Sequence, residues 1–426
     1  MTKKIIVIQL LLVKLCFSQF SPEWVKFYNA EGNSQDFGYS LVIDNENNVI
    51  VSGTSQTLLS GEDFVTVKYS PGGAQLWANR YTDTGLTQET CFINAIDDKN
   101  NIYTGGISTV FNGWNYVMIK YDKLGSIKWV NKIHNNTNQV GYLHSISLDD
   151  AFNVYYVVSA PGLVSELVKL DSNGITQWRR SLTGNVYGSA FCVIDNPTNS
   201  VIVCSTVPDT VSGLLITKFS ESGNTLWTNY IKRYGTYEGI TPKDICIINS
   251  NIYITSNISS AILILKYSPS GSFLWGKIYD SYILNSSRSV IPAGEEQIYI
   301  GGIASGTNDD FLIMKYSPDG NLLWDRVFDS GSNDNLYDIC SDENNNIYAS
   351  GISDHGCSTA KFDKDGNYIT SDIYKIQPDE TSWGFSNGYA NNSLYVTGYG
   401  IGNGTGCDII TLKYGTLIGL NPVSQE

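Results

Sequence analysis

Positive charge is scarce in this 426-residue sequence, which has 27 lysines and arginines against 41 aspartates and glutamates and a formal net charge of −14. No run of basic residues concentrates what positive charge there is into one patch. A chain of this charge repels nucleic acid and anionic lipid. We therefore expect no nucleic-acid partner.

Residues that bind metals or form disulfides are also few. The three histidines are dispersed, and the eight cysteines include no CxxC motif and no adjacent pair. Seven cysteines follow residue 18, an odd number that does not suit a disulfide framework, although Cys357 and Cys407 fall in corresponding regions of neighbouring repeats and are a candidate pair. Turns such as DNENN and DENNN lack the twelve-residue acidic spacing of calcium loops. We predict no metal site and no cofactor.

Long apolar runs are limited to the start of the chain. Residues 5–17 follow Lys3 and Lys4 and form an apolar run that is too short to span a bilayer comfortably. We interpret residues 1–18 as a secretory signal peptide, with a retained anchor as the alternative. No other run approaches membrane-spanning length, so we predict a mature protein without a membrane span that is secreted, extracellular or at the cell surface.

Tryptophan recurs along the chain at a nearly constant spacing. The intervals are 52, 49, 49, 48 and 49 residues between Trp77, Trp129, Trp178, Trp227, Trp275 and Trp324. Each tryptophan ends a similar phrase, from KYSPGGAQLW to KYSPDGNLLW. A seventh copy, KFDKDGNYIT, lacks the tryptophan, and an eighth, KYGTLIG, begins at Lys413. Units of about 50 residues are typical of propeller blades.

A second repeated phrase precedes each of these and has the composition of a β-strand. Its copies include NVIVSGTS, NIYTGGIS, QIYIGGIA and SLYVTGYG, which are rich in Ile, Val and Tyr and bounded by Asn, Asp and Gly. No part of the mature chain sustains a capped 3.6-residue period. We predict an all-β fold, with one closed propeller of four-stranded blades over residues 19–415 and a tail over 416–426. Counting the repeats gives eight blades, and seven is the alternative.

The two ends of the repeat array complement each other. The segment EWVKFYN, with Trp24, is a lone outer strand at the start, whereas the last repeat supplies LYVTGYG and DIITLKYG without a clear outer strand. Pairing the first segment with the last blade completes that blade and removes two exposed sheet edges. We therefore predict that the N-terminal strand closes the ring.

The order of these phrases resembles a known family. The pattern [IV]Y.[ST]G, then DF.T.KY, then a G-x-x-x-W turn resembles the bacterial β-propeller repeat (SBBP-type) proteins over roughly residues 22–415. That resemblance implies a bacterial protein that is secreted or on the cell surface. The family name implies seven blades, whereas this chain counts to eight.

Positions that repeat in every blade are expected to hold the ring together, whereas positions that break the pattern are free to carry function. One repeated lysine falls in the first class and is interpreted as structural: Lys68, Lys120, Lys169, Lys218, Lys266, Lys315, Lys361 and Lys413. Trp114 and Trp383 lie outside the repeating phase, and we expect both in loops that share one rim of a propeller. They are candidates for an aromatic platform that binds a glycan or a peptide; filling gaps in the core is the alternative.

Three aspartates mark the ends of loops on the same rim. Asp63, Asp310 and Asp408 each precede an apolar strand and are candidate ligand contacts. Their alternative role is to form the turn before the strand and to keep the surface soluble.

Catalytic motifs are absent from the sequence. It contains no GxSxG, HExxH or P-loop pattern, and we assign no catalytic residue. We predict a non-catalytic extracellular binding or scaffolding module, monomeric, that presents a loop-rich face to a glycan or protein partner. The alternative is a secreted enzyme that acts on polysaccharide with carboxylates in the central funnel, because such pairs converge in space and not in sequence. A purely structural envelope protein is a third hypothesis.

Overall fold

The computed structural model describes residues 20–415 except for eleven short segments: 32–33, 58–60, 84–87, 111, 136–139, 160–163, 186–189, 208–212, 236–238, 377–380 and 402–405. The predicted signal peptide (residues 1–18) and the tail (416–426) lie outside the described residues.

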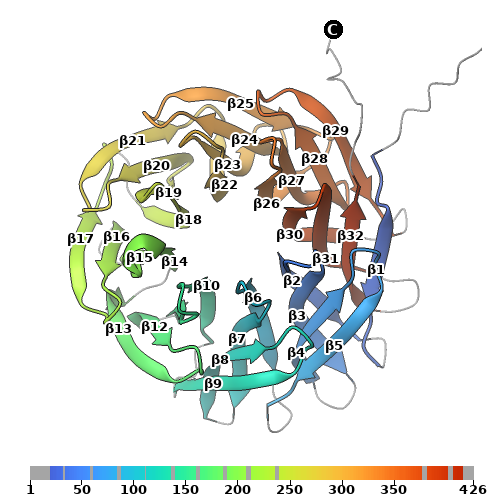
Figure 1. The fold of residues 1–426 in the computed structure, drawn as a ribbon. Helices are drawn as coiled ribbons and strands as arrows, with labels where there is room; N and C mark the ends of the chain where they lie inside the picture. The colour runs from blue at the N-terminus through green and yellow to red at the C-terminus, as the bar shows by residue number, and fades with distance from the viewer. Residues whose placement is uncertain are drawn as a thin grey trace, which may run out of the picture.

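The described chain forms eight four-stranded antiparallel sheets that surround a common axis as the blades of a propeller (Figure 1). Within each blade we name the strands A to D from the axis outward. Blades 1 and 2 comprise β2 (Asp36–Ile43), β3 (Val49–Thr57), β4 (Gly61–Tyr69), β5 (Gln75–Tyr81), and β6 (Glu89–Ile96), β7 (Ile102–Val110), β8 (Gly113–Tyr121), β9 (Ile127–Asn135). Blades 3 and 4 comprise β10 (Tyr142–Leu148), β11 (Val154–Ser159), β12 (Val164–Leu170), β13 (Thr176–Asn185), and β14 (Ala190–Asp195), β15 (Ser200–Val207), β16 (Gly213–Phe219), β17 (Thr225–Ile231).

The second half of the ring repeats this arrangement. Blades 5 and 6 comprise β18 (Ile240–Ile248), β19 (Asn251–Ile258), β20 (Ala261–Tyr267), β21 (Phe273–Tyr279), and β22 (Leu284–Pro292), β23 (Ile298–Ser305), β24 (Asp309–Tyr316), β25 (Leu322–Phe328). Blades 7 and 8 comprise β26 (Asp334–Ser341), β27 (Ile347–Ser353), β28 (Gly356–Phe362), β29 (Tyr368–Tyr374), and β30 (Ser382–Ala390), β31 (Ser393–Ile401), β32 (Cys407–Tyr414), β1 (Trp24–Tyr28). One short 3₁₀ helix, η1 (Asn196–Thr198), forms the A–B turn of blade 4.

The hydrophobic core lies between neighbouring blades. Strands B and C are buried on both faces, which explains their nearly continuous runs of Ile, Val and Tyr. One cluster, for example, joins Ile50 and Phe64 of blade 1 to Ile102 and Val117 of blade 2. Each blade therefore needs both of its neighbours to bury its faces, as expected for a closed array of repeats.

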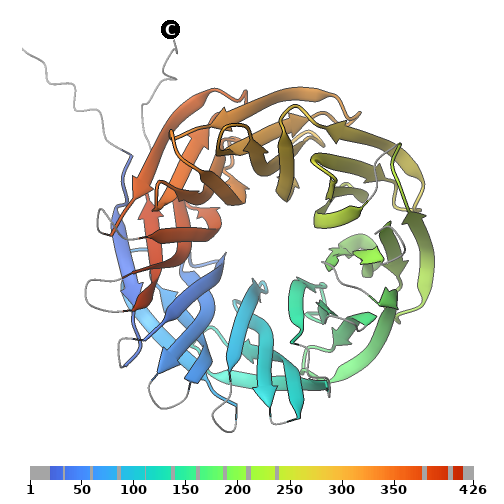
Figure 2. The same cartoon turned by 180° about the vertical axis from the view of Figure 1, so that it is seen from behind.

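The ring closes through its first strand, as predicted. β1 pairs antiparallel with β32, with Trp24 opposite Lys413, and becomes strand D of blade 8 (Figures 1 and 2). The indole Nε1 of Trp24 then donates a hydrogen bond to the carbonyl oxygen of Pro71 in blade 1, at 3.1 Å. The eight-bladed count and the closure by the N-terminal strand are both confirmed.

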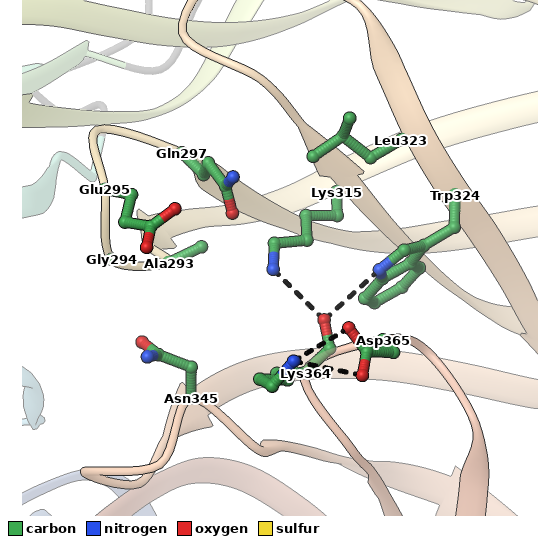
Figure 3. A pocket seen from close by; sticks show the side chains of 10 residues that line it. All are labelled: Ala293, Gly294, Glu295, Gln297, Lys315, Leu323, Trp324, Asn345, Lys364 and Asp365. Carbon is green, nitrogen blue, oxygen red and sulfur yellow. Dashed lines mark hydrogen bonds and ion pairs between the residues drawn. The ribbon is translucent and has the colours of Figure 1, made fainter.

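The repeated lysine and tryptophan join six of the eight blades to the next one. In blade 6, Lys315 Nζ and Trp324 Nε1 donate to the same acceptor, the carbonyl oxygen of Lys364 in the C–D turn of blade 7, at 3.0 and 3.3 Å (Figure 3). We call this arrangement the clasp. The same arrangement forms in blades 1 to 5, on the carbonyl oxygens of Lys123, Ser172, Glu221, Pro269 and Pro318. The amines of these lysines thus end on a neighbouring backbone carbonyl.

A glycine in the C–D turn completes each clasp. Gly366 has φ of +82°, which tight turns require of glycine. A Cβ atom there would also lie 2.7 Å from Cδ2 of Trp324. The glycine is therefore needed both for the turn and for the close approach of the tryptophan ring.

The clasp also explains the missing tryptophan of the seventh repeat. Thr370 pairs with Lys361 as Trp324 pairs with Lys315, so Thr370 occupies the tryptophan position of blade 7. The next blade is blade 8, whose strand D comes from the other end of the chain and is not joined to strand C by a turn. A tryptophan at residue 370 would therefore lack the usual carbonyl acceptor.

Two further expectations concern cysteines and membrane spans. Cys357 and Cys407 are both free thiols in the structure, so the candidate disulfide between them is not formed. No helix within the described residues has the length and apolar character needed to cross a membrane.

Candidate functional site

The innermost strands carry a shared irregularity. In seven blades the pairing of strand A with strand B skips one residue, as between Gly38 and Ser40 in β2. A β-bulge of this kind leaves one residue out of the ladder and redirects its side chain. Strand A of blade 4 pairs without a shift, and Phe191 takes the corresponding place there.

These eight residues line the central cavity together. We call them the bulge ring: Tyr39, Phe92, His144, Phe191, Lys243, Arg288, Tyr337 and Phe385. The cavity has a volume of about 450 Å³, within the range of roughly 300–1,000 Å³ of small-molecule sites. Each blade contributes one side chain to the bulge ring, so residues about 50 positions apart in the sequence converge on a single site.

Six members of the bulge ring are aromatic, and their rings follow one another around the axis. The Tyr39 ring centroid lies 5.7 Å from that of Phe385 and 6.5 Å from that of Phe92. Phe385 is 4.8 Å from Tyr337 with a steep interplanar angle of 71°. Such rings present a broad apolar surface whose position is fixed by mutual packing.

The remaining two members are cations on adjacent blades. Lys243 belongs to β18 and Arg288 to β22, and both side chains are half-buried. The Arg288 guanidinium lies 5.6 Å from the centroid of the Tyr337 ring. Burial, and then the nearby Arg288 charge, lower the pKa of Lys243.

Two carboxyl groups lie beside the bulge ring in the same cavity. Asp244 accepts a hydrogen bond from the backbone N–H of Val290 at 2.8 Å, and Asp338 accepts one from the N–H of Asn387 at 3.0 Å. Each carboxyl therefore joins its own blade to the next. Burial raises the pKa of Asp244 to about 6 and that of Asp338 to about 7.

His144 is held as a neutral member of the ring. Its Nε2 lies 2.6 Å from the hydroxyl oxygen of Ser159. Burial lowers its pKa to about 4, so the imidazole carries no charge at neutral pH.

Of the residues proposed from sequence, Trp383 lies in this region. It is in β30, two residues before Phe385, and its ring stacks at 5.9 Å on Tyr399 and lies 6.0 Å from Phe385 and 6.1 Å from Tyr337. Trp383 therefore extends the aromatic surface of the bulge ring along blade 8.

Trp114 lies elsewhere, in the core between blades 2 and 3. Its side chain is 1% exposed and meets the ring of Tyr116 edge-on at 4.3 Å. Gly141 directly precedes β10, and a Cβ atom at this position would overlap Cη2 of the Trp114 indole ring. The expected platform of Trp114 with Trp383 is not formed, because the Trp114 indole is enclosed where two blades meet, as the gap-filling alternative describes.

The three aspartates occupy corresponding positions but different surroundings. Asp63 is 1% exposed and forms an ion pair with Arg80 of the outer strand β5. Asp408 is 5% exposed, in β32 of blade 8. Neither presents an open surface on the rim. Their roles as ligand contacts stay predictions.

Asp310, in contrast, lies in a group of acids. Its carboxylate oxygen and those of Asp329 and Asp334 all lie within 4.8 Å of one another. Burial and the charges of Asp329 and Asp334 raise the pKa of Asp310 to about 6. Strand D of this blade has Val327 where blade 1 has Arg80, so no cation from that position offsets the charge.

Sequence reasoning missed the bulge ring, although a signal for it exists. In several repeats the bulge residue stands five positions before the aspartate that begins the A–B link, as Tyr39 precedes Asp44 and Phe92 precedes Asp97. Read down the repeats, this column is Tyr, Phe, His, Phe, Lys, Arg, Tyr, Phe. The residue at this position is aromatic in six blades and is a cation only in blades 5 and 6.

Comparison with known proteins supports the fold. Neither a family model nor a curated protein matches the sequence. Among solved structures, the chain is similar to the Dos1 propeller, with a TM-score of 0.58, 11% identity, and coverage of 95% of this chain and 98% of that one. It is also similar to the WD40 domain of SCAP from fission yeast, with a TM-score of 0.53, 11% identity, and coverage of 92% and 98%. A third similar structure is the BP39L lectin from Burkholderia pseudomallei, with a TM-score of 0.50, 10% identity, and coverage of 79% and 98%.

Proposed function

We propose that this protein is a non-catalytic binding or scaffolding propeller that acts outside the cell and takes a glycan or protein ligand at its central cavity. The observation that carries this proposal is the bulge ring, in which six of eight positions are aromatic and line a cavity of about 450 Å³. Aromatic surfaces with few polar groups are typical of binding sites, because rigid rings give large contact area at low entropic cost.

The location of the ring within the fold supports this proposal. The repeated residues are occupied by structural contacts in the clasps and in the cores between blades, as are Lys315 and Trp324. Seven of the eight bulge-ring residues contribute little to strand pairing because they are left out of the ladder, whereas Phe191 is paired with Cys204. Their side chains are therefore free to vary from blade to blade and to meet a ligand.

A panel of glycans and surface proteins tests the proposal. We expect the double variant Tyr39→Ala/Phe385→Ala and the single variant Trp383→Ala to weaken the binding of a ligand found on that panel at least tenfold. Phe273→Ala is the matched control, since Phe273 is 51% exposed on the outer strand β21. Binding that is equal in all of these variants and the wild type would refute the proposal.

One observation favours the enzyme alternative. Asp244 and Asp338 line the same cavity with raised pKa values of about 6 and about 7, which suit general acids. Their carboxyl oxygens are already bound to backbone N–H groups of the next blade, which favours a structural role. Release of reducing sugar from a polysaccharide panel, abolished by Asp338→Asn in a variant that still folds, would favour the enzyme.

A further inference from the structure

The two cations of the bulge ring differ from the clasp lysines of blades 1 to 6. Most lysines of the repeat donate to a backbone carbonyl in a clasp, and Lys218 also forms a buried ion pair with Asp195 at 2.8 Å. Lys243 and Arg288 make no ion pair or hydrogen bond with any described residue. Instead they stand beside each other at the cavity, and the Arg288 charge acts on Lys243.

The acids of the cavity do not compensate these charges. Asp244 accepts from the N–H groups of Val290 and Ile245, both at 2.8 Å. Asp338 is bound in the same way by the N–H groups of Asn387 and Ile339, at 3.0 and 2.9 Å. Backbone donors therefore hold both carboxyls in place, and the cation pair is left facing the cavity.

Half-buried like charges held side by side are unfavourable without a counter-charge. The Nε atom of Arg288 is buried and has no hydrogen-bond partner in the protein. A carboxylate between the two side chains would supply acceptors for both, and an arginine guanidinium suits a carboxylate particularly well because the two planar groups form paired hydrogen bonds.

Aromatic rings flank the cation pair on both sides. Tyr337 stacks against Arg288, and Phe191 is the bulge-ring member of the blade before Lys243. Beyond Tyr337 the aromatic surface continues through Phe385 to Tyr39. A ligand anchored by its charge on the cations would therefore lay its remaining atoms against the aromatic rings that line the same cavity.

We propose that the central cavity binds an acidic saccharide through one sugar carboxylate held between Lys243 and Arg288, with the sugar ring packed on the neighbouring aromatic side chains. This inference rests on the proposed function and names the class of ligand. The net charge of −14 repels extended polyanions, so the group that enters is the singly charged end of an oligosaccharide.

Titration calorimetry on the full chain tests this ligand class. The probes are oligosaccharides that end in a hexuronate, the matched neutral hexose oligosaccharides, and the matched sugars that carry a sulfate in place of the carboxylate. We expect the hexuronate probe to bind at least tenfold more tightly than the neutral one and to weaken as salt is raised. In Lys243→Gln/Arg288→Gln this advantage and its salt dependence are lost.

The control removes the same charge from the outer surface. Lys123→Gln/Lys128→Gln also changes the net charge by two, at side chains that are 53% and 54% exposed, and we expect it to keep the preference for the hexuronate. Equal binding of acidic and neutral probes, with no effect of the cation variant, would overturn the inference and leave the proposed function intact. Tighter binding of the sulfated probe, or equal binding of acetate, would also overturn it. If no probe binds and the aromatic variants change nothing on the wider panel, both proposals fail.

Discussion

The outer and inner edges of the blades use the same repeat in opposite ways. At the outer edge, six blades place identical residue types in the clasp, as in Lys315 and Trp324. At the inner edge, the bulge position changes from aromatic to cationic around the ring, as from Phe191 to Lys243. The outer residues must all satisfy the same contact with the next blade. The inner residues face the cavity and are under no such constraint, so selection for a ligand can act on them one by one.

The largest effect is expected at a clasp. Trp324→Ala removes a large ring from the interface of blades 6 and 7 together with its hydrogen bond to Lys364. We expect a loss of about 3 kcal/mol in the free energy of unfolding, measured by urea denaturation. Thr370→Ala at the corresponding position of blade 7 should cost less than about 1 kcal/mol, because no carbonyl acceptor follows it. Equal costs would show that the clasp does not join the blades.

The turn glycine gives a second test of the outer edge. Gly366→Ala would strain a positive φ and press on the Trp324 ring, for an expected cost of about 2 kcal/mol. Gly235→Ala is the control, since Gly235 also has positive φ, of +64°, but no atom lies within 4 Å of the added Cβ. The excess cost of Gly366→Ala over Gly235→Ala measures the contact with the tryptophan.

At the inner edge the expected effect depends on pH. The folded protein lowers the pKa of His144 from its usual 6.5 to about 4, so the unfolded chain binds the proton more readily between these values. The contribution of neutral His144 to the free energy of unfolding is therefore fully present above pH 6.5 and is lost as the pH falls toward 4. Relative to the wild type, the full shift corresponds to about 3 kcal/mol in favour of His144→Phe at pH 4 over pH 7, and solvent screening of this half-buried side chain reduces the expected gain to roughly 1–2 kcal/mol. Parallel pH profiles of unfolding for the two proteins would contradict this assignment.

The smallest effect concerns the rim, where blades 1 and 6 differ in charge compensation. Because the pKa of Asp310 is raised in the folded protein, the protonated side chain favours folding at low pH. This contribution to the free energy of unfolding is lost as the pH rises through about 6. Asp310→Asn should therefore stabilise the protein above pH 6, by up to about 1 kcal/mol in this partly exposed setting, and not below pH 4. Asp63→Asn should instead destabilise at neutral pH, because it breaks the ion pair with Arg80. Thermal melts of both variants at pH 4 and pH 7 test this contrast in sign.

The role of a residue could be predicted from the sequence where that residue recurs in every repeat, and could not be predicted where it occurs in one repeat alone. The repeated lysines can be interpreted as structural from the sequence, since they recur in phase. Trp114 and Trp383 both break the phase, yet one is buried between blades and the other extends the cavity surface. The structure separates them, because Trp114 belongs to the buried cluster between blades 2 and 3 and packs against Gly141.

By itself the sequence determined the number of blades and the closure of the ring. These follow from a period, and a period is visible in a single chain because each blade must bury the same two faces. Only the tertiary structure decided the site. A bulge shifts the alternation of side chains by one residue, so the strand pattern cannot tell which residue of strand A faces the axis. Tyr39 and Phe385 meet across 346 residues of sequence because the ring closes, and no local signal records that distance.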